Sequence, residues 1–222
     1  NPFSVGPYVT SNQSRAIRNY GMNFPYSGGI PRPGRYPFVN ALNFSDIGYD
    51  FVGAQVHADG EIWSATNFDI RRLLLAKYPG SSSRQRECAD GQRPPQECPG
   101  NRRWFQLYYD AMVLMPIRPS MLDARNAILA ADVMRFGGAN QKELWLGYAR
   151  QGFGVGAASS NTTANTDIDP TPDFEPVGTT PATVNFEVEN SDGDDVSARI
   201  YVGHYETRAS PIADTNPATS RL

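Results

Sequence analysis

The amino-acid sequence predicts a mainly α-helical protein with a coil-rich N-terminal segment and a C-terminal β-hairpin. Three observations carry this prediction. The first fifty residues are dense in Pro, Gly, Asn and Tyr and keep neither a two-residue nor a 3.6-residue apolar period for long. Between residues 58 and 156, apolar residues recur at spacings of three and four, as on one face of a helix. After residue 183, apolar and polar residues alternate, as they do in strands.

The apolar period predicts two helices before Pro116. The first covers about residues 58–78 and ends at a Pro-Gly pair, which cannot continue a helix. A polar stretch that we interpret as a loop follows it. The second helix covers residues 103–115 and is apolar around much of its circumference. A helix of that composition is expected to be buried on more than one side.

Two further helices follow, each with a recognisable start. Ser120 precedes Asp123 by three residues, the pattern of an N-cap with a carboxylate in the first turn, and Gly137 ends the helix. Asn140 and Glu143 repeat that pattern before the fourth helix, which a second glycine ends.

These elements divide the chain into four parts. Residues 1–57 form a coil-rich segment whose many aromatic residues are expected to pack on the helical domain, residues 58–156. Residues 157–182 turn to Ser, Thr, Asn, Asp and Pro and are interpreted as a linker. Residues 183–222 hold the β-hairpin and an extended tail. Two strands alone are marginally stable in water, so we expect the hairpin to join a sheet outside this chain.

Charge and hydropathy exclude two kinds of partner. The 20 Lys and Arg residues nearly balance 23 Asp and Glu residues, the formal net charge is -3 and the pI is about 5.4. No basic surface for nucleic acid is indicated. No apolar run approaches the ~20 residues that cross a bilayer, so we expect no membrane span. The chain begins with Asn1 and shows no basic-then-apolar leader, so we expect that any signal or pro-segment has been removed.

The two cysteines point to an oxidising compartment. Cys88 and Cys98 lie in a Pro-, Gly- and Arg-rich stretch, where a disulfide would close a small loop. Two cysteines with no histidine nearby make a poor zinc site, and they lack the two-residue spacing of a redox pair. The pattern favours a disulfide in a secreted, extracellular protein; a pair of free thiols is the alternative.

The common catalytic motifs of hydrolases are absent. GxSxG does not occur, so a serine hydrolase is a poor interpretation. HExxH does not occur either. His57 and Glu61 are four residues apart and could face one another on a helix, but two ligands do not hold a catalytic zinc ion. Taken alone, a single histidine at a helix start is more often structural than catalytic.

Three stretches resemble the fungalysin family of secreted zinc metallopeptidases. Residues 56–70, VHADGEIWSATNFDI, resemble the family's VHxxGExWA stretch. Residues 6–27, which contain AIRNY and end in PYS, resemble its GIRxxPYS segment. Residues 115–154, from MPIRPSM to QGFG, resemble its PxFxDARDAI…GGAN…RGLG run. The matches occur in the family's order over about 150 residues.

This resemblance implies a thermolysin-like C-terminal helical domain of a secreted peptidase. In the family these stretches follow the HExxH helix and a downstream glutamate ligand. The resemblance therefore implies zinc in the complete enzyme, bound by residues that are not in this chain. It also implies two partners, namely the zinc-binding upstream half of the same precursor and a peptide or protein substrate.

The resemblance also assigns roles to single residues. His57 matches the histidine that donates a hydrogen bond to the oxyanion when zinc-bound water adds to the peptide carbonyl. Arg18 aligns with an arginine that binds the substrate carbonyl and supports this histidine, so it is both catalytic and substrate-binding. Asp50 is the nearest upstream acidic residue that could orient His57. Glu61 is interpreted as structural, a carboxylate favoured near a helix N-terminus.

The C-terminal part has no counterpart that we can place in the fungal enzymes. His204 falls in a strand pattern and is interpreted as solvated or packed. The acidic residues of NSDGDD, residues 190–195, could bind calcium through their oxygen atoms. A hairpin turn rich in Asp and Gly also forms without a metal, so calcium stays one of two interpretations.

Two hypotheses from different classes follow. In the first, the chain is the C-terminal half of a secreted zinc metalloendopeptidase and is inactive alone because HExxH is absent. In the second, it is a non-catalytic secreted binding or structural module on a degenerate peptidase scaffold. The reading frame upstream discriminates between them, since only an enzyme needs HExxH and a downstream glutamate there.

Overall fold

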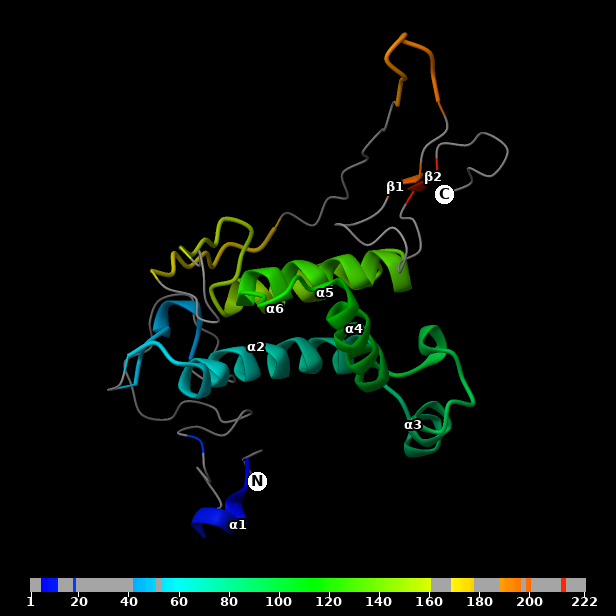
Figure 1. The fold of residues 1–222 in the computed structure, drawn as a ribbon. Coiled ribbons are helices and arrows are strands. Elements are labelled where there is room, and N and C mark those ends of the chain that lie inside the picture. The colour runs from blue at the N-terminus through cyan, green and yellow to red at the C-terminus, as the bar shows by residue number, and fades with distance from the viewer. Residues whose placement is uncertain are drawn as a thin grey trace.

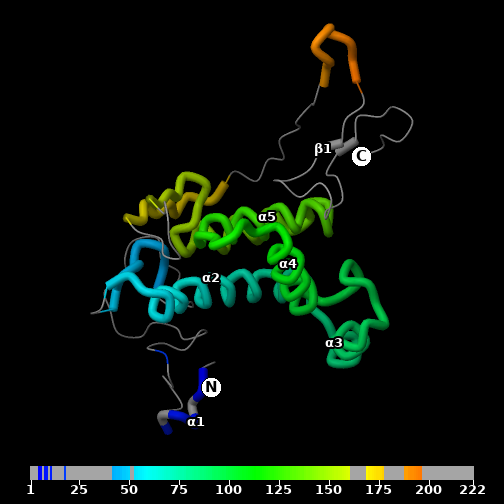
Figure 2. Tube along the Cα trace, in the orientation of Figure 1, coloured from blue at the N-terminus to red at the C-terminus, as the bar shows by residue number. Residues whose placement is uncertain are grey.

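The computed structural model describes residues 5–11, 18, 42–50, 53–160, 169–177, 188–196, 199–200 and 213–214 (Figure 2). The elements, in chain order, are α1 (Pro7–Thr10), η1 (Phe44–Asp46), α2 (Val56–Lys77), α3 (Ser82–Ala89), η2 (Pro95–Glu97), α4 (Gly100–Leu114), α5 (Met121–Phe136), α6 (Gln141–Arg150), β1 (Arg199–Ile200) and β2 (Ala213–Asp214). The predicted mainly α-helical fold is confirmed, because the described part holds only these two short strands.

The helices form two layers joined by α4. Figure 1 shows α2 in one layer, α5 and α6 in the other, and α4 crossing between them. The most extensive contacts are those of α4 with α5, of α2 with α6 and of α2 with α4. α2 therefore lies against both a crossing helix and the opposite layer, which makes it the central element of the domain.

The core lies between α2 and the other layer. Ile62, Ile70 and Leu74 of α2 are fully buried, as are Leu107 of α4 and Leu144 of α6. The three α2 residues are eight and four residues apart, which places them on one side of the helix, and the first predicted helix is confirmed.

The backbones of α2 and α4 touch where α4 begins. A Cβ atom placed on Gly100 would lie 2.1 Å from the carbonyl oxygen of Leu74. Gly100 N–H also donates to the carbonyl of Tyr78, at 2.9 Å. Only glycine permits this approach, so the start of α4 is fixed against the end of α2.

The predicted start and end of α5 are confirmed. Asp123 N–H donates to Ser120 Oγ at 3.0 Å, and Ser120 N–H donates to Asp123 Oδ2 at 2.9 Å, which completes a capping box. Gly137 follows the last turn with a φ of 61°, the left-handed conformation that ends helices.

Asn140 is the N-cap residue of α6, as predicted, but its side chain does not cap the helix. Its side chain makes no capping hydrogen bond and instead donates to Asp132 Oδ1 at 2.6 Å. Asn140 N–H and Gln141 Nε2 both donate to Asp132 Oδ2 at 3.0 Å. Glu143 forms an ion pair with Lys77 at 2.7 Å. A buried carboxylate requires such partners, and these bonds join α5 to α6.

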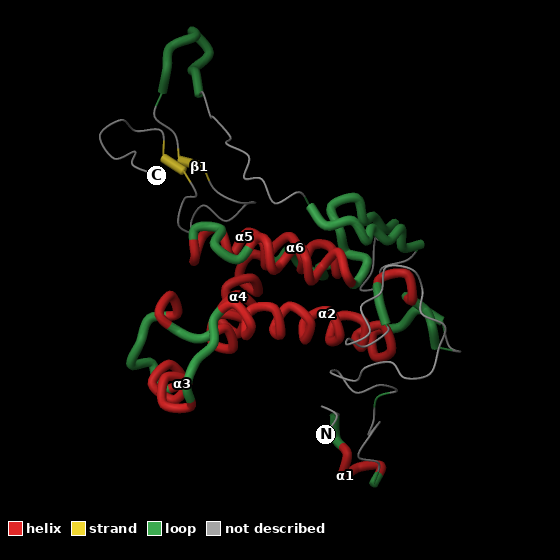
Figure 3. The backbone as a smooth tube through the Cα atoms, turned by 180° about the vertical axis from the view of Figure 1, so that it is seen from behind, coloured by secondary structure: helices red, strands yellow, loops and turns green. Residues whose placement is uncertain are grey.

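The polar stretch after α2 contains a helix that the apolar period could not reveal. α3 is polar almost throughout and starts from Ser81, whose hydroxyl accepts from Arg84 N–H at 3.2 Å. The predicted disulfide between Cys88 and Cys98 is present, and both cysteines are buried. Figure 3 shows α3 in a lobe beside the start of α4, set apart from the α2, α5 and α6 layers.

The expectation that α4 is buried on more than one side is met only in part, because α4 packs against both α2 and α5 but not on all of its apolar surface. Phe105, Tyr109 and Met112 are 60%, 65% and 65% exposed, whereas Leu107 and Ala111 are fully buried. The helix thus presents large apolar side chains on its remaining face. Its hydrophobic composition is real, but within this chain only part of it is covered.

The C-terminal predictions are described only in part. Val196 N–H donates to the carbonyl of Val188 at 2.9 Å around a turn at the predicted place. Residues 184–187 and 197–198 lie outside the described residues, so the hairpin as a whole stays a prediction. β1 pairs with β2 in an antiparallel register. In the predicted linker, Thr171 pairs with Ala158 next to the helical domain.

No helix in the described part of the chain is long and apolar enough to cross a bilayer.

Replacing Cys88 and Cys98 with serine is expected to lower the free energy of unfolding by about 3 kcal/mol, because the disulfide limits the entropy of the unfolded chain. Urea unfolding of the wild type and of the double variant measures the difference. A reductant should shift the wild-type midpoint and leave the variant unchanged; an unshifted wild type would show that the bond adds nothing.

Asp69 on α2 makes stability depend on pH. Its side chain is buried 3.6 Å from Arg150, and burial raises the pKa of the carboxyl even though Arg150 and Arg72 lower it. A raised folded-state pKa means that the folded protein binds the proton more tightly than the unfolded chain. Stability therefore falls as pH rises through the folded pKa.

We expect Asp69→Asn to be at least as stable as the wild type at pH 7 and to lose that advantage as pH falls, because the wild-type carboxyl then takes up a proton more readily in the folded protein than in the unfolded chain. Urea unfolding at pH 7, 5.5 and 4 measures this change. Asp90→Asn, at an exposed carboxylate, is the control. An Asp69→Asn advantage that stays constant over this pH range would contradict the assignment.

Candidate functional site

The first turn of α2 holds His57 at the protein surface. Gln55 is the N-cap, in extended conformation, and its side-chain oxygen accepts from His57 N–H at 2.9 Å. The same oxygen lies 3.3 Å from His57 Nδ1. Because this atom already accepts a backbone N–H, it is the amide oxygen, so Nδ1 is the donor in the second contact. The imidazole is thereby oriented by Gln55 while it remains exposed to solvent.

Asp59 fixes the loop that leads into this turn. Its carboxylate is 5% exposed and accepts two backbone hydrogen bonds at 2.8 Å, from Gly48 N–H and from Gln55 N–H. The loop itself is anchored by Phe44, whose N–H donates to the carbonyl of Gln151 at 2.8 Å. The backbone that carries Gln55 is therefore bound at both ends, so the position of His57 is well defined.

The roles of the other residues singled out by the sequence are less well defined by the structure. Asp50 lies half-buried in the loop before α2, and its role as an orienting group stays a prediction, because the contact to the imidazole described above is made by Gln55. Glu61 is buried in α2, in keeping with a structural role. Arg18 is half-buried in a bend whose neighbours lie outside the described residues, so its approach to His57 stays a prediction. His204 lies outside the described residues.

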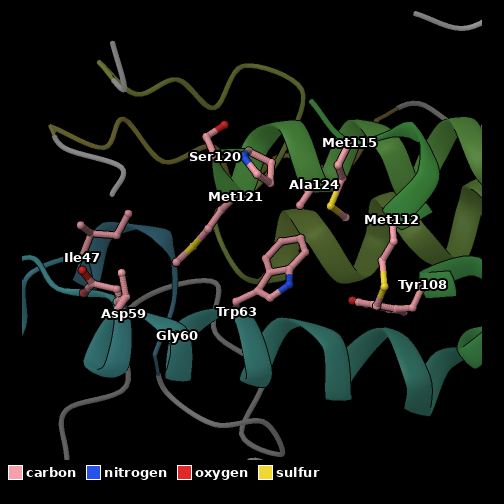
Figure 4. Close-up of a pocket in the computed structure, with 12 residues that line it drawn as sticks. Ile47, Asp59, Gly60, Trp63, Tyr108, Met112, Met115, Ser120, Met121 and Ala124 are labelled. Atoms are coloured by element: carbon pink, nitrogen blue, oxygen red, sulfur yellow. The ribbon is translucent and has the colours of Figure 1, made fainter. Parts of the chain in front are cut away.

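An apolar cavity of about 370 Å³ opens along the N-terminal half of α2, and His57 is not one of its lining residues. Figure 4 shows it between α2 and the helices α4 and α5, with Trp63 projecting from α2 into the space and methionines facing it from the other side. Three residues of the first turns of α2, Val56, Asp59 and Gly60, belong to its wall. The remaining lining residues are Ile47, Trp63, Tyr108, Met112, Met115, Pro119, Ser120, Met121 and Ala124. Methionine-rich walls adapt to the shape of what they contact.

The hydroxyl of Tyr108 is the polar group inside this cavity wall that has no partner. Three ring polar atoms in the described residues are buried without a hydrogen bond, namely those of Trp104, Tyr108 and Tyr148, and of these residues only Tyr108 lines the cavity. Burial raises the pKa of Tyr108 well above its usual value, with a smaller contribution from Tyr148. Figure 4 shows the hydroxyl directed into the space between α2 and α4. The cavity is thus apolar with one unused donor.

Comparison with known proteins connects this arrangement to a family. The model of the fungalysin metallopeptidase family (M36) matches residues 1–157. This chain belongs to the fungalysin family. It is 35% identical over 159 residues to the extracellular metalloproteinase MEP of Fusarium vanettenii, over 71% of this chain and 22% of that protein. Extracellular metalloproteinases of Aspergillus fumigatus and Aspergillus niger are 32% identical over 75% of the chain and 33% identical over 57% of it.

The chain spans less than a quarter of the length of these relatives, 22%, 24% and 20% respectively. The relatives are named extracellular, which implies secretion of the fungalysins. The disulfide agrees with an oxidising compartment.

A metallopeptidase family implies a metal cofactor, typically zinc, and the described residues of this fungalysin chain do not fit one. They include no group of three or more His, Cys, Asp or Glu side chains that could hold a metal ion. The side-chain oxygen of Asn190, in the stretch considered for calcium, accepts from Asp192 N–H and Asp194 N–H at 2.9 Å. That oxygen atom stabilises the turn, and calcium binding by the neighbouring carboxylates stays a prediction.

The sequence could not reveal Gln55, Asp59 or the cavity as parts of this site. Asp59 binds Gly48, eleven residues away, so local spacing carries no trace of the contact. Gln55 is an unusual N-cap, since short polar residues are preferred there. The cavity joins residues of three helices, which only the fold brings together.

Proposed function

We propose that this chain is the C-terminal part of a secreted zinc metalloendopeptidase, with the zinc site in an upstream part of the same precursor. It supplies His57 and Arg18 to the substrate cleft that the two parts form together. The observation that supports this most is the exposed imidazole of His57, oriented by Gln55 at the start of α2, within a chain that belongs to the fungalysins.

His57 acts on the peptide carbonyl as water adds to it. Negative charge then develops on the carbonyl oxygen, and a fixed donor aimed at that oxygen lowers the barrier by roughly 3–4 kcal/mol. Gln55 engages Nδ1, so Nε2 is the ring nitrogen left to face the carbonyl oxygen. An imidazolium donor forms a stronger hydrogen bond to an oxyanion than a neutral ring does.

Arg18 binds the backbone carbonyl of the substrate beside His57. A guanidinium presents its donors in a fixed planar fork, so it can hold a carbonyl while it limits rotation of the substrate. Neither residue activates water, and we assign that step to the upstream part. The substrate is a peptide or protein, in keeping with the peptidase family of the chain.

The upstream reading frame separates this proposal from the second hypothesis. A frame that encodes HExxH and a downstream glutamate in that order supports the enzyme. A frame in which these positions are substituted supports a secreted module that kept the scaffold and lost catalysis. We expect the intact motif.

The 222-residue chain alone is expected neither to bind zinc tightly nor to cleave casein, while the full-length precursor does both. The physical reason is that a catalytic zinc ion needs three protein ligands in addition to the water that it activates. Zinc titration by calorimetry and a casein assay on both proteins measure this difference. Tight zinc binding by the chain alone would contradict the proposal that the zinc ligands lie in the upstream part.

In the full-length enzyme, His57→Ala is expected to lower kcat by about 10²–10³, the usual effect of losing one oxyanion donor. The melting temperature should change little, because the side chain is exposed. His204→Ala, which removes the other histidine of this chain, is the matched control and should leave kcat unchanged. Normal turnover by His57→Ala would eliminate the role assigned to it.

A further inference from the structure

One face of α4 is apolar and uncovered. Phe105, Tyr109 and Met112 follow one another at spacings of four and three, so they line up along one side of the helix. Each is at least 60% exposed. We call these three residues the α4 strip. It is continuous with the cavity described above, because Met112 belongs to both.

The charged residues of α4 near the strip already have partners. Asp110 accepts two hydrogen bonds from Arg135, at 2.7 and 3.0 Å. Arg102 donates to Gln106 at 2.8 Å, and Gln106 in turn donates to Asp110 at 2.7 Å. The strip therefore offers a binding partner apolar side chains, while Asp110 is paired with Arg135 and Arg102 is hydrogen-bonded to Gln106. A partner that fits it is apolar on the contacting face.

The cavity sets a second requirement on the partner. Its volume of about 370 Å³ lies within the range of ligand sites, and its wall is built mainly from apolar side chains. Among the described residues, the Tyr108 hydroxyl is buried in that wall with no hydrogen-bond partner. A buried hydroxyl without a partner lowers the stability of the folded protein, and a hydrogen bond from a binding partner would remove that cost. An occupant that supplies large apolar side chains and one hydrogen-bonding group satisfies both features.

We propose that the α4 strip and the cavity form the seat for an amphipathic helix of the upstream, zinc-binding part of the same precursor. Apolar side chains of that helix enter the cavity, its apolar face covers the strip, and one of its polar atoms bonds the Tyr108 hydroxyl. An apolar groove between helices is the usual receptor of such a segment. This inference rests on the proposed function, which places the zinc site upstream.

Two observations favour this occupant over other apolar partners. The chain spans only 22% of the Fusarium vanettenii relative, so most of a protein of that size lies outside it. The cavity also reaches the first turns of α2 through Val56, Asp59 and Gly60, and these turns carry His57 on another side of the helix. A segment seated there brings the zinc-binding part to the end of α2 that bears the histidine of the proposed reaction. A partner bound elsewhere on the domain would not join the two halves of the cleft.

Cysteine labelling tests this seat directly. Met112→Cys and Tyr109→Cys are each prepared in the 222-residue chain and in the full-length precursor, and the rate of reaction with a maleimide is measured without reductant. Because both side chains are exposed, these variants should fold normally. We expect both introduced thiols to react at least about tenfold more slowly in the full-length protein, since a covered side chain is closed to the reagent. Lys142→Cys, exposed on α6, is the control and should react equally in both proteins.

The outcomes separate the possible occupants. Equal reaction rates of the introduced thiols in the two proteins would overturn the proposal. Protection that already occurs in the 222-residue chain and increases with its concentration would assign the strip to a second copy and would also overturn it. Protection of the introduced thiols without casein cleavage by the wild-type precursor would support the seat and contradict the proposed function. Casein cleavage without protection of the thiols would support the proposed function and contradict the seat.

Tyr108→Phe gives an independent measurement. In the 222-residue chain this change should leave the melting temperature unchanged or raise it, because it removes an unpaired buried hydroxyl. In the full-length protein it should lower the melting temperature, because the bond to the seated segment is lost. The same shift in both proteins would show that the hydroxyl gains no partner from the upstream part.

Discussion

The packing of α2 against α4 and α6 is the constraint on which the rest of the structure depends. The close approach of Gly100 to Leu74 fixes the C-terminal end of α2, and its buried residues fix the rotation of the helix about its axis. A rigid helix then determines where its first turn lies. His57 is held at the surface by the burial of residues several turns away along α2, not by local contacts alone.

The two ends of α2 are built in different ways. At the C-terminal end the contacts are complete: backbone touches backbone, Lys77 pairs with Glu143, and Asp132 receives three hydrogen bonds from the start of α6. At the N-terminal end, hydrogen bonds to Asp59 fix the backbone, but the wall toward α4 and α5 stays open. One end stabilises the domain, and the other keeps a surface for function.

Much of this fold could be predicted from the sequence, for reasons that particular residues make plain. Helices with an apolar stripe can be predicted from the period of their apolar residues. The Ser120–Asp123 capping box is a local feature that residue spacing alone reveals. α3 escaped prediction because it is stabilised by a cap and a disulfide rather than by an apolar face. The side-chain contact of Asn140 escaped prediction because its buried partner, Asp132, lies on another helix.

The partial burial of α4 shows what a hydrophobic pattern can and cannot predict. Period and composition indicate which side chains are suited to burial, but not which molecule buries them. Leu107 and Ala111 are covered by this chain, while the large apolar side chains of Tyr109 and Met112 are not. The pattern therefore marks side chains suited to burial whether or not this chain covers them.

The site could be predicted only where a resemblance supplied the chemistry. His57 is unremarkable by spacing, and a family motif singled it out. Its orientation by Gln55, the anchoring by Asp59 and the adjoining cavity depend on contacts between distant segments. These features share a physical consequence. Exposed apolar residues and an unpaired buried hydroxyl both cost stability, so a domain that carries them beside an oriented histidine is suited to being completed by another part of its protein.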